Sequence, residues 1–356
     1  MTERVVVCMS GGVDSTVAAL LLKDRGYDVA GLTFWFWSFA HAPDYAGRTK
    51  CCSLDQAARA AAELDIPHET IDLSEPFRKL VLVDYVERYR RGETPNPCGR
   101  CNRLLRFGRA IEYARENGFD AVATGHHVRR IEKYGRYGLI RGIDPSKDQT
   151  YFLYGLGQRE LEHLRFPVGD RTKADVFELA RSRELSCAEL PESQDLCFAL
   201  GGETRFLFAE EDFMPGPILD VEGRVLGQHD GLPNYTIGQR RGLGVTSDRP
   251  LYVIDIDPER NALIVGGPSA LLRSDLSAVN ANYLSGTPPA DGRPVDAKVR
   301  YRSPAARAVL RSPSETQFDL HFDTPQRAIT PGQIAALYDD NELLGGGTIA
   351  RSQTTR

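Results

Sequence analysis

The stretch of residues 5–16, near the amino end of the chain, places the tightest constraint on the fold. It reads VVVCMSGGVDST, an apolar run followed by two glycines and by hydroxyl and acidic residues. The apolar run predicts a buried strand, and the glycines allow a sharp turn into a helix over 16–25, which Gly26 ends. The first amides of a helix have no partners within it and lie at the positive end of its dipole. The stretch therefore predicts a strand, an anion-binding loop and a helix, in that order.

Hydroxyl and acidic residues in this loop indicate what it binds. Ser10, Ser15 and Thr16 are hydroxyl donors for a polyphosphate, whereas Asp14 carries the wrong charge and is better suited to bridge a metal ion or to start the helix. Glycines alone would fit any strand-to-helix turn of an α/β domain. The full string S-G-G-V-D-S resembles the pyrophosphate loop of the PP-loop ATP pyrophosphatases, which adenylate a substrate oxygen. The string lacks the G-K-[ST] ending of a Walker A loop, which disfavours γ-phosphate transfer.

Length and composition bound the remaining possibilities. The 356 residues suffice for two or three domains. No apolar run reaches membrane-spanning length, and the first strand begins too early for a signal peptide, so we expect a cytoplasmic protein without a membrane partner. Seven cysteines in such a chain are expected to be catalytic, metal-binding or buried. The net charge of −5 gives no general attraction to RNA, so an RNA partner requires a local basic surface.

Alternating strands and helices predict an α/β domain with a Rossmann-like parallel sheet. Further strands are expected over 28–35, 67–72 and 120–124 and further helices over 54–64, from 74 to about 92, and over 173–183. Ligands of such sheets lie beyond the carboxyl ends of the strands, which places Phe34 and the run Gly125-His126-His127 near a bound nucleotide. A single phenylalanine is more often a core aromatic residue than a base contact, and this reading also applies to Phe34.

Cysteines provide the second informative pattern. In T-P-N-P-C-G-R-C-N, residues 94–102, the prolines place Cys98 and Cys101 on a loop just before a new helix. We expect the helix end, Arg100 and Arg103 to acidify a thiol there. The C-x-x-C spacing suits a metal, a cluster or a redox pair, although zinc needs four ligands and the sequence has no second C-x-x-C. The adjacent pair Cys51 and Cys52 is poorly placed to bind one metal ion, and we interpret it as buried or loop thiols.

The periodicity changes to that of β-structure after residue 201. Strand pairs are expected at 218–220 with 224–226 and at 251–256 with 262–265. Strands then recur from residue 276 and predict a small β-barrel, over 295–302, 306–310, 316–322, 334–338 and 343–349. We expect an α/β catalytic domain over 1–202, a small, mainly β domain over 203–272 and a β-barrel over 273–356.

Several further motifs follow S-G-G-V-D-S in a fixed order, namely T-P-N-P-C-x-x-C-N, A-T-G-H, K-D-Q, F-P-V-G, E-S-Q-D-L-C-F, T-I-G-Q-R-R-G-L-G, V-R-Y-R and T-P-G-Q. Over essentially its whole length the chain resembles the tRNA-specific 2-thiouridylases of the MnmA family. The resemblance implies that ATP, with Mg²⁺, adenylates the C2 oxygen of the wobble uridine and that sulfur then displaces AMP. It also implies tRNA and a persulfide or sulfide donor protein as partners. We expect the protein to act as a monomer.

The resemblance assigns roles to particular residues. It implies catalytic roles for Asp14, for Cys197 as the persulfide carrier and for Cys101 as its partner. It implies that the nucleotide is held by Cys8, Met9, Ser10, Gly11, Gly12, Val13, Asp14, Ser15, Phe34 and Gly125. It implies that tRNA is contacted by Asn96, Pro97, Cys98, His126, Lys147, Asp148, Gln149, Arg300, Tyr301 and Gln333.

A basic strip in the barrel favours contacts with RNA phosphates, through Lys298, Arg300, Arg302, Arg307 and Arg311. Reaching a wobble base would require flipping it out of the anticodon stack.

Several alternatives remain open on the sequence. Cys98, Cys101 and Cys197 could instead hold a [4Fe–4S] cluster with one free iron, and spacing does not decide between cluster and persulfide chemistry. A disulfide or inert thiols are a third reading. Two other functional classes also fit: an adenylating ligase or amidotransferase acting on a small molecule, and a non-catalytic iron–sulfur or RNA-binding protein.

Overall fold

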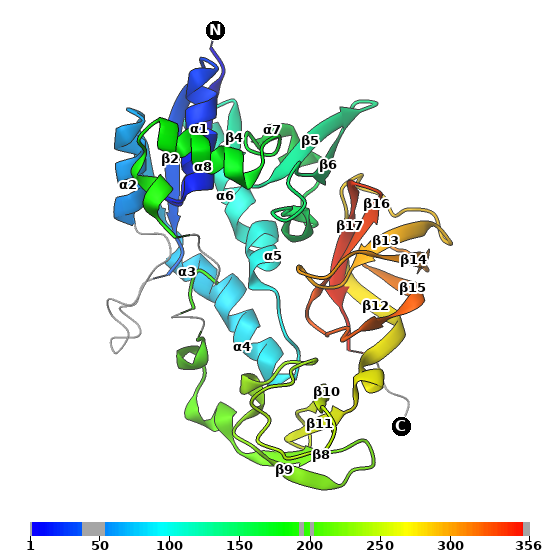
Figure 1. Cartoon of the computed structure of the whole chain (residues 1–356). Helices are drawn as coiled ribbons and strands as arrows, with labels where there is room; N and C mark the ends of the chain where they lie inside the picture. The colour runs from blue at the N-terminus through cyan, green and yellow to red at the C-terminus, as the bar shows by residue number, and fades with distance from the viewer. Residues whose placement is uncertain (1, 38–53, 192–195, 200–202, 352–356) are drawn as a thin grey trace.

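The computed structural model describes residues 2–37, 54–191, 196–199 and 203–351 (Figure 1). The amino-terminal part is built on a five-stranded, wholly parallel sheet in the order β3–β2–β1–β4–β7. Its strands are β1 (Arg4–Cys8), β2 (Asp28–Trp35), β3 (His68–Asp72), β4 (Ala121–Thr124) and β7 (Leu164–Arg165). The predicted α/β fold with a parallel sheet is therefore confirmed.

Helices cover both faces of this sheet, which explains the uninterrupted apolar run in β1. Val5 and Val7 belong to one buried cluster and Val6 to another, because alternate side chains of a strand point to opposite faces. The first cluster includes residues of α1 (Val13–Asp24), α2 (Leu54–Glu63) and α8 (Lys173–Ser182), and the second includes residues of α4 (Val83–Arg90) and α6 (Phe107–Glu116). The strand order reverses at β1 and β4, which is where open α/β sheets bind ligands.

A run of helical segments connects β3 to β4. It comprises α3 (Ser74–Phe77), the π-helical η3 (Arg78–Leu82), α4, α5 (Pro97–Cys101), the π-helical η4 (Asn102–Arg106) and α6. The prediction that both cysteines precede a helix was wrong, because Cys98 and Cys101 lie within α5. Asn96 caps this helix by accepting a 2.9 Å hydrogen bond from the amide of Gly99, and Pro97 occupies its first position, which proline favours.

The central part is a four-stranded sheet in the order β10–β11–β8–β9, shown at the foot of Figure 1. Its strands are β8 (Gly216–Leu219), β9 (Val225–His229), β10 (Tyr252–Asp257) and β11 (Ala262–Gly266). Both predicted antiparallel pairs are present, and β11 joins them by pairing in parallel with β8.

The carboxy-terminal part is a closed β-barrel, as predicted. Six strands follow one another in the order β12–β15–β14–β13–β16–β17, and pairing of β12 with β17 closes the ring. They are β12 (Leu272–Tyr283), β13 (Pro294–Lys298), β14 (Ala306–Arg311), β15 (Gln317–Arg327), β16 (Ile334–Asp339) and β17 (Glu342–Ile349). The strand expected over 295–302 ends at Lys298, and the residues after it form bends and turns.

A hairpin from the amino-terminal part extends the barrel sheet. It consists of β5 (Val128–Lys133) and β6 (Arg136–Arg141), and β6 pairs with β17. The barrel also contacts the amino-terminal part through the side-chain amide of Asn282. This amide donates hydrogen bonds to the carbonyls of Tyr154 at 2.7 Å and Leu156 at 2.9 Å. Figure 1 shows the hairpin reaching across to the red strands of the barrel. The two parts are therefore held together by backbone pairing as well as by side chains.

Short helical segments complete the described chain. They are η5 (Thr150–Leu153), α7 (Gln158–His163), η6 (Ser186–Glu189), η7 (Arg205–Leu207), η8 (Glu210–Phe213), η9 (Leu232–Asn234) and η10 (Pro268–Leu271). Within the described ranges, no helix combines the length and apolar character needed to cross a lipid bilayer.

Candidate functional site

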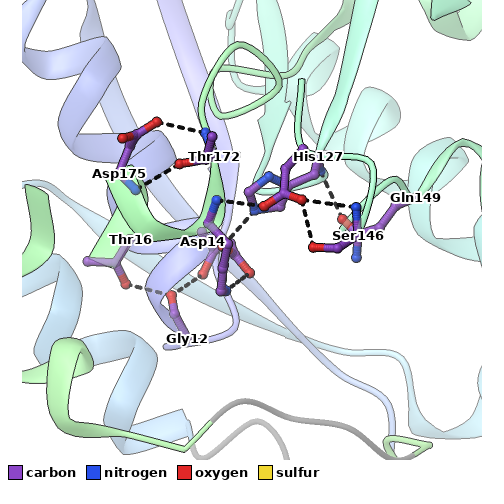
Figure 2. Close-up of polar contacts among 11 residues, drawn as sticks. Gly12, Asp14, Thr16, His127, Ser146, Gln149, Thr172 and Asp175 are labelled. Carbon is purple, nitrogen blue, oxygen red and sulfur yellow. Dashed lines mark hydrogen bonds and ion pairs between the residues drawn. The ribbon is translucent and has the colours of Figure 1, made fainter. Parts of the chain in front are cut away.

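The loop between β1 and α1 is held by its own hydroxyl groups. The carbonyl oxygen of Gly12 accepts hydrogen bonds from the hydroxyls of Ser15 and Thr16, each at 3.0 Å, and Figure 2 shows the bond from Thr16. Gly11 has a φ of 78°, and a Cβ there would lie 2.6 Å from the Cβ of Gln56, so this position requires glycine. Helix α1 begins at Val13, three residues before the predicted start, which places Asp14 in its first turn.

Asp14 is the centre of a buried polar cluster. The ammonium of Lys173 lies 2.7 Å from each carboxylate oxygen of Asp14, and Nε2 of His127 donates to Oδ1 at 2.9 Å. Figure 2 shows Asp14 and His127 facing one another below the start of α8. Burial alone would raise the pKa of Asp14, but the hydrogen bonds from His127 and Lys173, with the charge of Lys173, outweigh it and lower the pKa. Asp14 is therefore a carboxylate at neutral pH.

Sequence reasoning did not assign a role to Lys173, although a signal was present. Thr172 caps α8, so Lys173 stands at the first helical position, next to the positive end of the helix dipole. A cation is disfavoured there unless a nearby anion compensates it. An unfavourable lysine at the first position of the helix predicted over 173–183 thus pointed to an acidic partner elsewhere in the chain.

A cavity of about 180 Å³ lies beside this loop at the carboxyl ends of the strands. Most of the residues proposed to bind the nucleotide line it, namely Cys8, Met9, Ser10, Asp14, Ser15, Phe34 and Gly125. Gly12 and Val13 instead line a larger neighbouring cavity, and Gly11 packs behind the loop against Gln56. The strand ends thus form a small pocket that opens beside the first turn of α1.

His126 and Arg106 also line this small cavity, although neither was predicted to bind the nucleotide. His126, proposed as a tRNA contact, borders this cavity, and its Nδ1 lies 2.8 Å from the hydroxyl of Thr124. Burial, followed by the charge of Arg106, lowers the pKa of His126 to about 3, so its ring is neutral near pH 7. The guanidinium of Arg106 also lines the cavity and lies 5.1 Å from the centre of the Phe36 ring.

A second cavity, of about 1270 Å³, adjoins the first and shares Ser10, Asp14 and Gln149 with it. Residues of the amino-terminal part and of the barrel line it. The proposed tRNA contacts among its lining are Asn96, Pro97, Cys98, Lys147, Asp148, Gln149, Tyr301 and Gln333. A larger space therefore opens directly beside the small cavity.

Some of the proposed tRNA contacts are engaged within the protein. Asp148 is buried and accepts hydrogen bonds from the amide and hydroxyl of Thr150. Arg300 does not line the large cavity: its guanidinium donates to the carbonyls of Ile237 and Ala328 and to the hydroxyl of Thr330. Arg300 thus joins the central part to the barrel.

The basic strip of the barrel is divided between different surfaces. Lys298 and Arg302 line the large cavity, and burial lowers the pKa of Lys298. Arg307 lies 3.8 Å from Asp296, and Arg311 borders a separate cavity on the barrel. Only part of the predicted strip therefore faces the site.

The expectation of acidified thiols was wrong. Burial raises the pKa of Cys101, and it raises the pKa of Cys8 to about 11. Arg100 points away, with its Nε 3.3 Å from Asp84, and Arg103 donates to the carbonyl of Asn280 at 2.7 Å. The guanidinium beside the thiol is that of Arg106, which hydrogen-bonds Cys101 and partly offsets the effect of burial.

Among the described residues, Cys8, Cys98, Cys101 and Cys187 are free thiols. Cys98 and Leu196 both line the large cavity, while Cys101 is buried. Cys197 is half-buried and packs against the same hydrophobic cluster to which Cys101 belongs. Among the described residues, no three His, Cys, Asp or Glu side chains are arranged to hold a metal ion. Cys51, Cys52 and residues 192–195 of the E-S-Q-D-L-C-F motif lie outside the described residues.

Comparisons with known proteins cover all three parts of the chain. Residues 3–201 match the family model described as tRNA methyl transferase HUP domain. Residues 204–267 match the tRNA methyl transferase PRC-barrel domain, and residues 273–349 the aminomethyltransferase beta-barrel domain.

Full-length relatives extend this similarity. The tRNA-specific 2-thiouridylase MnmA of Moorella thermoacetica is 47% identical over 353 residues, covering 97% of this chain and 98% of that protein. The protein of the same name from Roseiflexus castenholzii is 43% identical over 370 residues, covering 98% and 99%. That of Thermoanaerobacter sp. strain X514, named MnmA 2, is 44% identical over 359 residues, covering 99% of each chain.

Proposed function

This chain belongs to the MnmA family of tRNA-specific 2-thiouridylases, and we propose on that basis that it converts the wobble uridine of tRNA to 2-thiouridine at the expense of ATP. One structural observation carries the assignment of the site. The small cavity beside the pyrophosphate-type loop and the large cavity bearing Cys98 share Ser10, Asp14 and Gln149. A nucleotide in the first would therefore meet a tRNA base in the second.

The chemistry requires such a junction because an amide-type oxygen is a poor leaving group. The C2 oxygen of uridine bonds to the α-phosphorus of ATP, the bond from that phosphorus to the bridging oxygen breaks, and pyrophosphate leaves with the electron pair. The amides at the start of α1 would stabilise the phosphates, because they have no partners within the helix. Sulfur can then attack C2, and AMP departs with the original oxygen.

Two cysteines deliver the sulfur in the second half of the proposed reaction, one of them as a persulfide. The terminal sulfur of a persulfide on Cys197 attacks C2, and the thiolate of Cys101 then attacks Sγ of Cys197. This step leaves sulfur on the base and forms a Cys101–Cys197 disulfide, which a dithiol reductant reopens. The packing of both cysteines against one hydrophobic cluster supports the pairing, and the hydrogen bond from Arg106 favours the Cys101 thiolate.

Two further groups implied by the family differ in their fit to the described residues. Magnesium is commonly held by one carboxylate together with substrate phosphates, and Asp14 could be that carboxylate. Bound there, Mg²⁺ would neutralise phosphate charge. A [4Fe–4S] cluster needs three or four thiolates, and the described cysteines are not arranged as such a site. We therefore derive no step through a cluster and favour the persulfide route, with a persulfide-bearing protein as the sulfur donor.

The remaining proposals concern partners and setting. Lys147, Lys298 and Arg302 border the large cavity and would meet RNA phosphates. A tRNA substrate and free thiols support a cytoplasmic location.

Cysteine variants test the proposed reaction. Purified protein would be supplied with tRNA, ATP and a persulfide donor, with 2-thiouridine measured by mass spectrometry and activation by tRNA-dependent ATP–pyrophosphate exchange. We expect Cys197→Ser and Cys101→Ser to abolish 2-thiouridine while exchange continues, because neither thiol takes part in adenylation. Val225→Ser, at an exposed residue of β9 that lines neither cavity, is the control and should retain both activities.

The outcomes separate the alternatives. Thiolation by Cys197→Ser would remove Cys197 from the mechanism. Exchange that needs no tRNA would favour a small-molecule ligase, and the mass of the product nucleoside separates thiolation from methyl transfer, which two of the family models mention. Iron and sulfide would also be measured on anaerobically purified protein. Activity that rises with iron content would overturn the persulfide route.

A further inference from the structure

A buried lysine stands at the start of α8, where the helix itself does not favour one. Lys173 is 9% exposed, and its ammonium lies 2.7 Å from both carboxylate oxygens of Asp14. Burial of an ammonium is costly, and the positive end of the helix dipole adds to that cost. A lysine held against both effects by a residue of the nucleotide loop calls for a functional explanation.

Other residues already provide hydrogen-bond partners for the backbone amides at the start of α8. The hydroxyl of Thr172 accepts from the amide of Asp175, and the carboxylate of Asp175 accepts from the amide of Thr172, as Figure 2 shows. Asp144 accepts from the backbone amide of Lys173 at 3.1 Å. The cap of α8 is therefore complete without the lysine side chain, whose ammonium is directed at the loop.

The location of Lys173 relative to the two cavities indicates which part of ATP it would meet. Ser10 and Asp14 line both cavities, whereas Lys173 lines only the large one. The small cavity takes its lining from Phe34 and Gly125 at the strand ends, where a nucleoside would sit. A phosphate chain leaving that pocket over the loop would therefore bring its β- and γ-phosphates, and not its α-phosphate, to the ammonium of Lys173.

We propose that Lys173 is a catalytic residue of the activation step, which binds the β- and γ-phosphates of ATP and stabilises the departing pyrophosphate. This inference rests on the function proposed above. Without nucleotide, Asp14 holds the ammonium; when ATP binds, its phosphates compete with that carboxylate, while Asp14 keeps its hydrogen bond from His127. As the bond between the α-phosphorus and the bridging oxygen breaks, the electron pair stays on pyrophosphate. Lys173 donates hydrogen bonds to it and transfers no proton.

Ligand binding tests the proposal without relying on thiolation. Lys173→Met keeps the apolar stem but removes the charge. We expect the variant to bind magnesium pyrophosphate and MgATP about 10- to 150-fold more weakly, the range for a lost hydrogen bond to a charged group, and to bind AMP within about twofold of the wild type. The kcat of tRNA-dependent exchange should fall, and Lys173→Arg should restore part of it. Lys79→Met, at an exposed lysine paired with Glu75, is the matched control and should change none of these values.

A purely structural role gives a different result. If Lys173 only holds Asp14 and the loop in place, AMP should be lost together with ATP and pyrophosphate, and that outcome would overturn the proposal. Unchanged pyrophosphate affinity would overturn it as well. If Lys173→Met does not fold, Lys173→Gln keeps a donor for Asp14 and supports the same comparison. Failure of the wild type to form 2-thiouridine would refute the proposed function. The affinities of wild type and variant for ATP, pyrophosphate and AMP could still be compared.

Discussion

Replacing Gly125 by alanine should displace the nucleotide loop by a predictable amount. A Cβ at this position would lie 2.6 Å from the carbonyl carbon of Asp14 and from the amide nitrogen of Ser15. Both atoms belong to the backbone and cannot turn aside as a side chain would. To reach 3.4 Å, where ordinary van der Waals contact begins, the two backbones must separate by about 0.8 Å.

This displacement has two measurable consequences. Overpacking of this kind costs roughly 1–3 kcal/mol of stability. The shift also moves Asp14 and the first amides of α1 relative to the strand ends, and a misplacement on the order of 1 Å in such a site can cost about 100-fold in activity. We therefore expect Gly125→Ala to lower the urea midpoint of unfolding and to weaken ATP binding by at least about tenfold, measured by calorimetry.

A second glycine supplies the control for this experiment. Gly108 lies in α6, and no heavy atom stands within 4 Å of a Cβ built there. Alanine is favoured over glycine in helices by about 0.5–1 kcal/mol, so Gly108→Ala should leave ATP binding unchanged and stability unchanged or slightly higher. If Gly125→Ala bound ATP and resisted urea as well as the wild type, the steric reasoning about this site would be refuted.

Two further predictions concern pH and salt. The folded state lowers the pKa of His126 from 6.5 to about 3, so the unfolded chain binds more protons between these values. Stability present above pH 6.5 should therefore be lost as the pH falls, by up to about 5 kcal/mol. His126→Asn should flatten the curve of stability against pH between 6.5 and 4, and an unchanged slope would contradict the assignment. Arg300→Met should lower the thermal midpoint without altering the salt dependence of tRNA binding, because the guanidinium bonds only protein acceptors among the contacts described. Lys298→Met should do the reverse and reduce the slope of log affinity against log salt by about one, so equal slopes in the two variants would refute this division of roles.

Local patterns were sufficient to predict much of the fold. Val5 to Val7 face two cores, so the strand is apolar throughout. Position 11 requires glycine because its φ is positive and Gln56 lies close to it. The barrel strands alternate between inward and outward side chains and could be read from that alternation. The pairing of β6 with β17 had no such signal, because it joins a hairpin near residue 140 to a strand near residue 343.

The surroundings of the thiols were not predictable from neighbours in sequence. Arg100 and Arg103 stand one and two positions from Cys101, and residues so spaced on a helix do not face each other. Arg106 follows Cys101 by five positions, which is the spacing of a π-helical turn, and η4 is π-helical over that interval. An expectation based on closeness in sequence therefore selects the wrong arginines.

Gln333 shows why loss of activity alone cannot identify an RNA contact in this molecule. The family resemblance assigns it to tRNA, and it does line the large cavity. Its amide, however, also donates to the carbonyl of Thr94 at 2.8 Å and to that of Pro95 at 3.3 Å, just before the helix that bears Cys98 and Cys101. A barrel residue thus supports the segment that positions the thiols, so RNA bound at Gln333 would act on that segment through the same side chain. Substituting Gln333 would disturb thiol placement and RNA affinity together, and only separate measurements of binding and of sulfur transfer can divide the two effects.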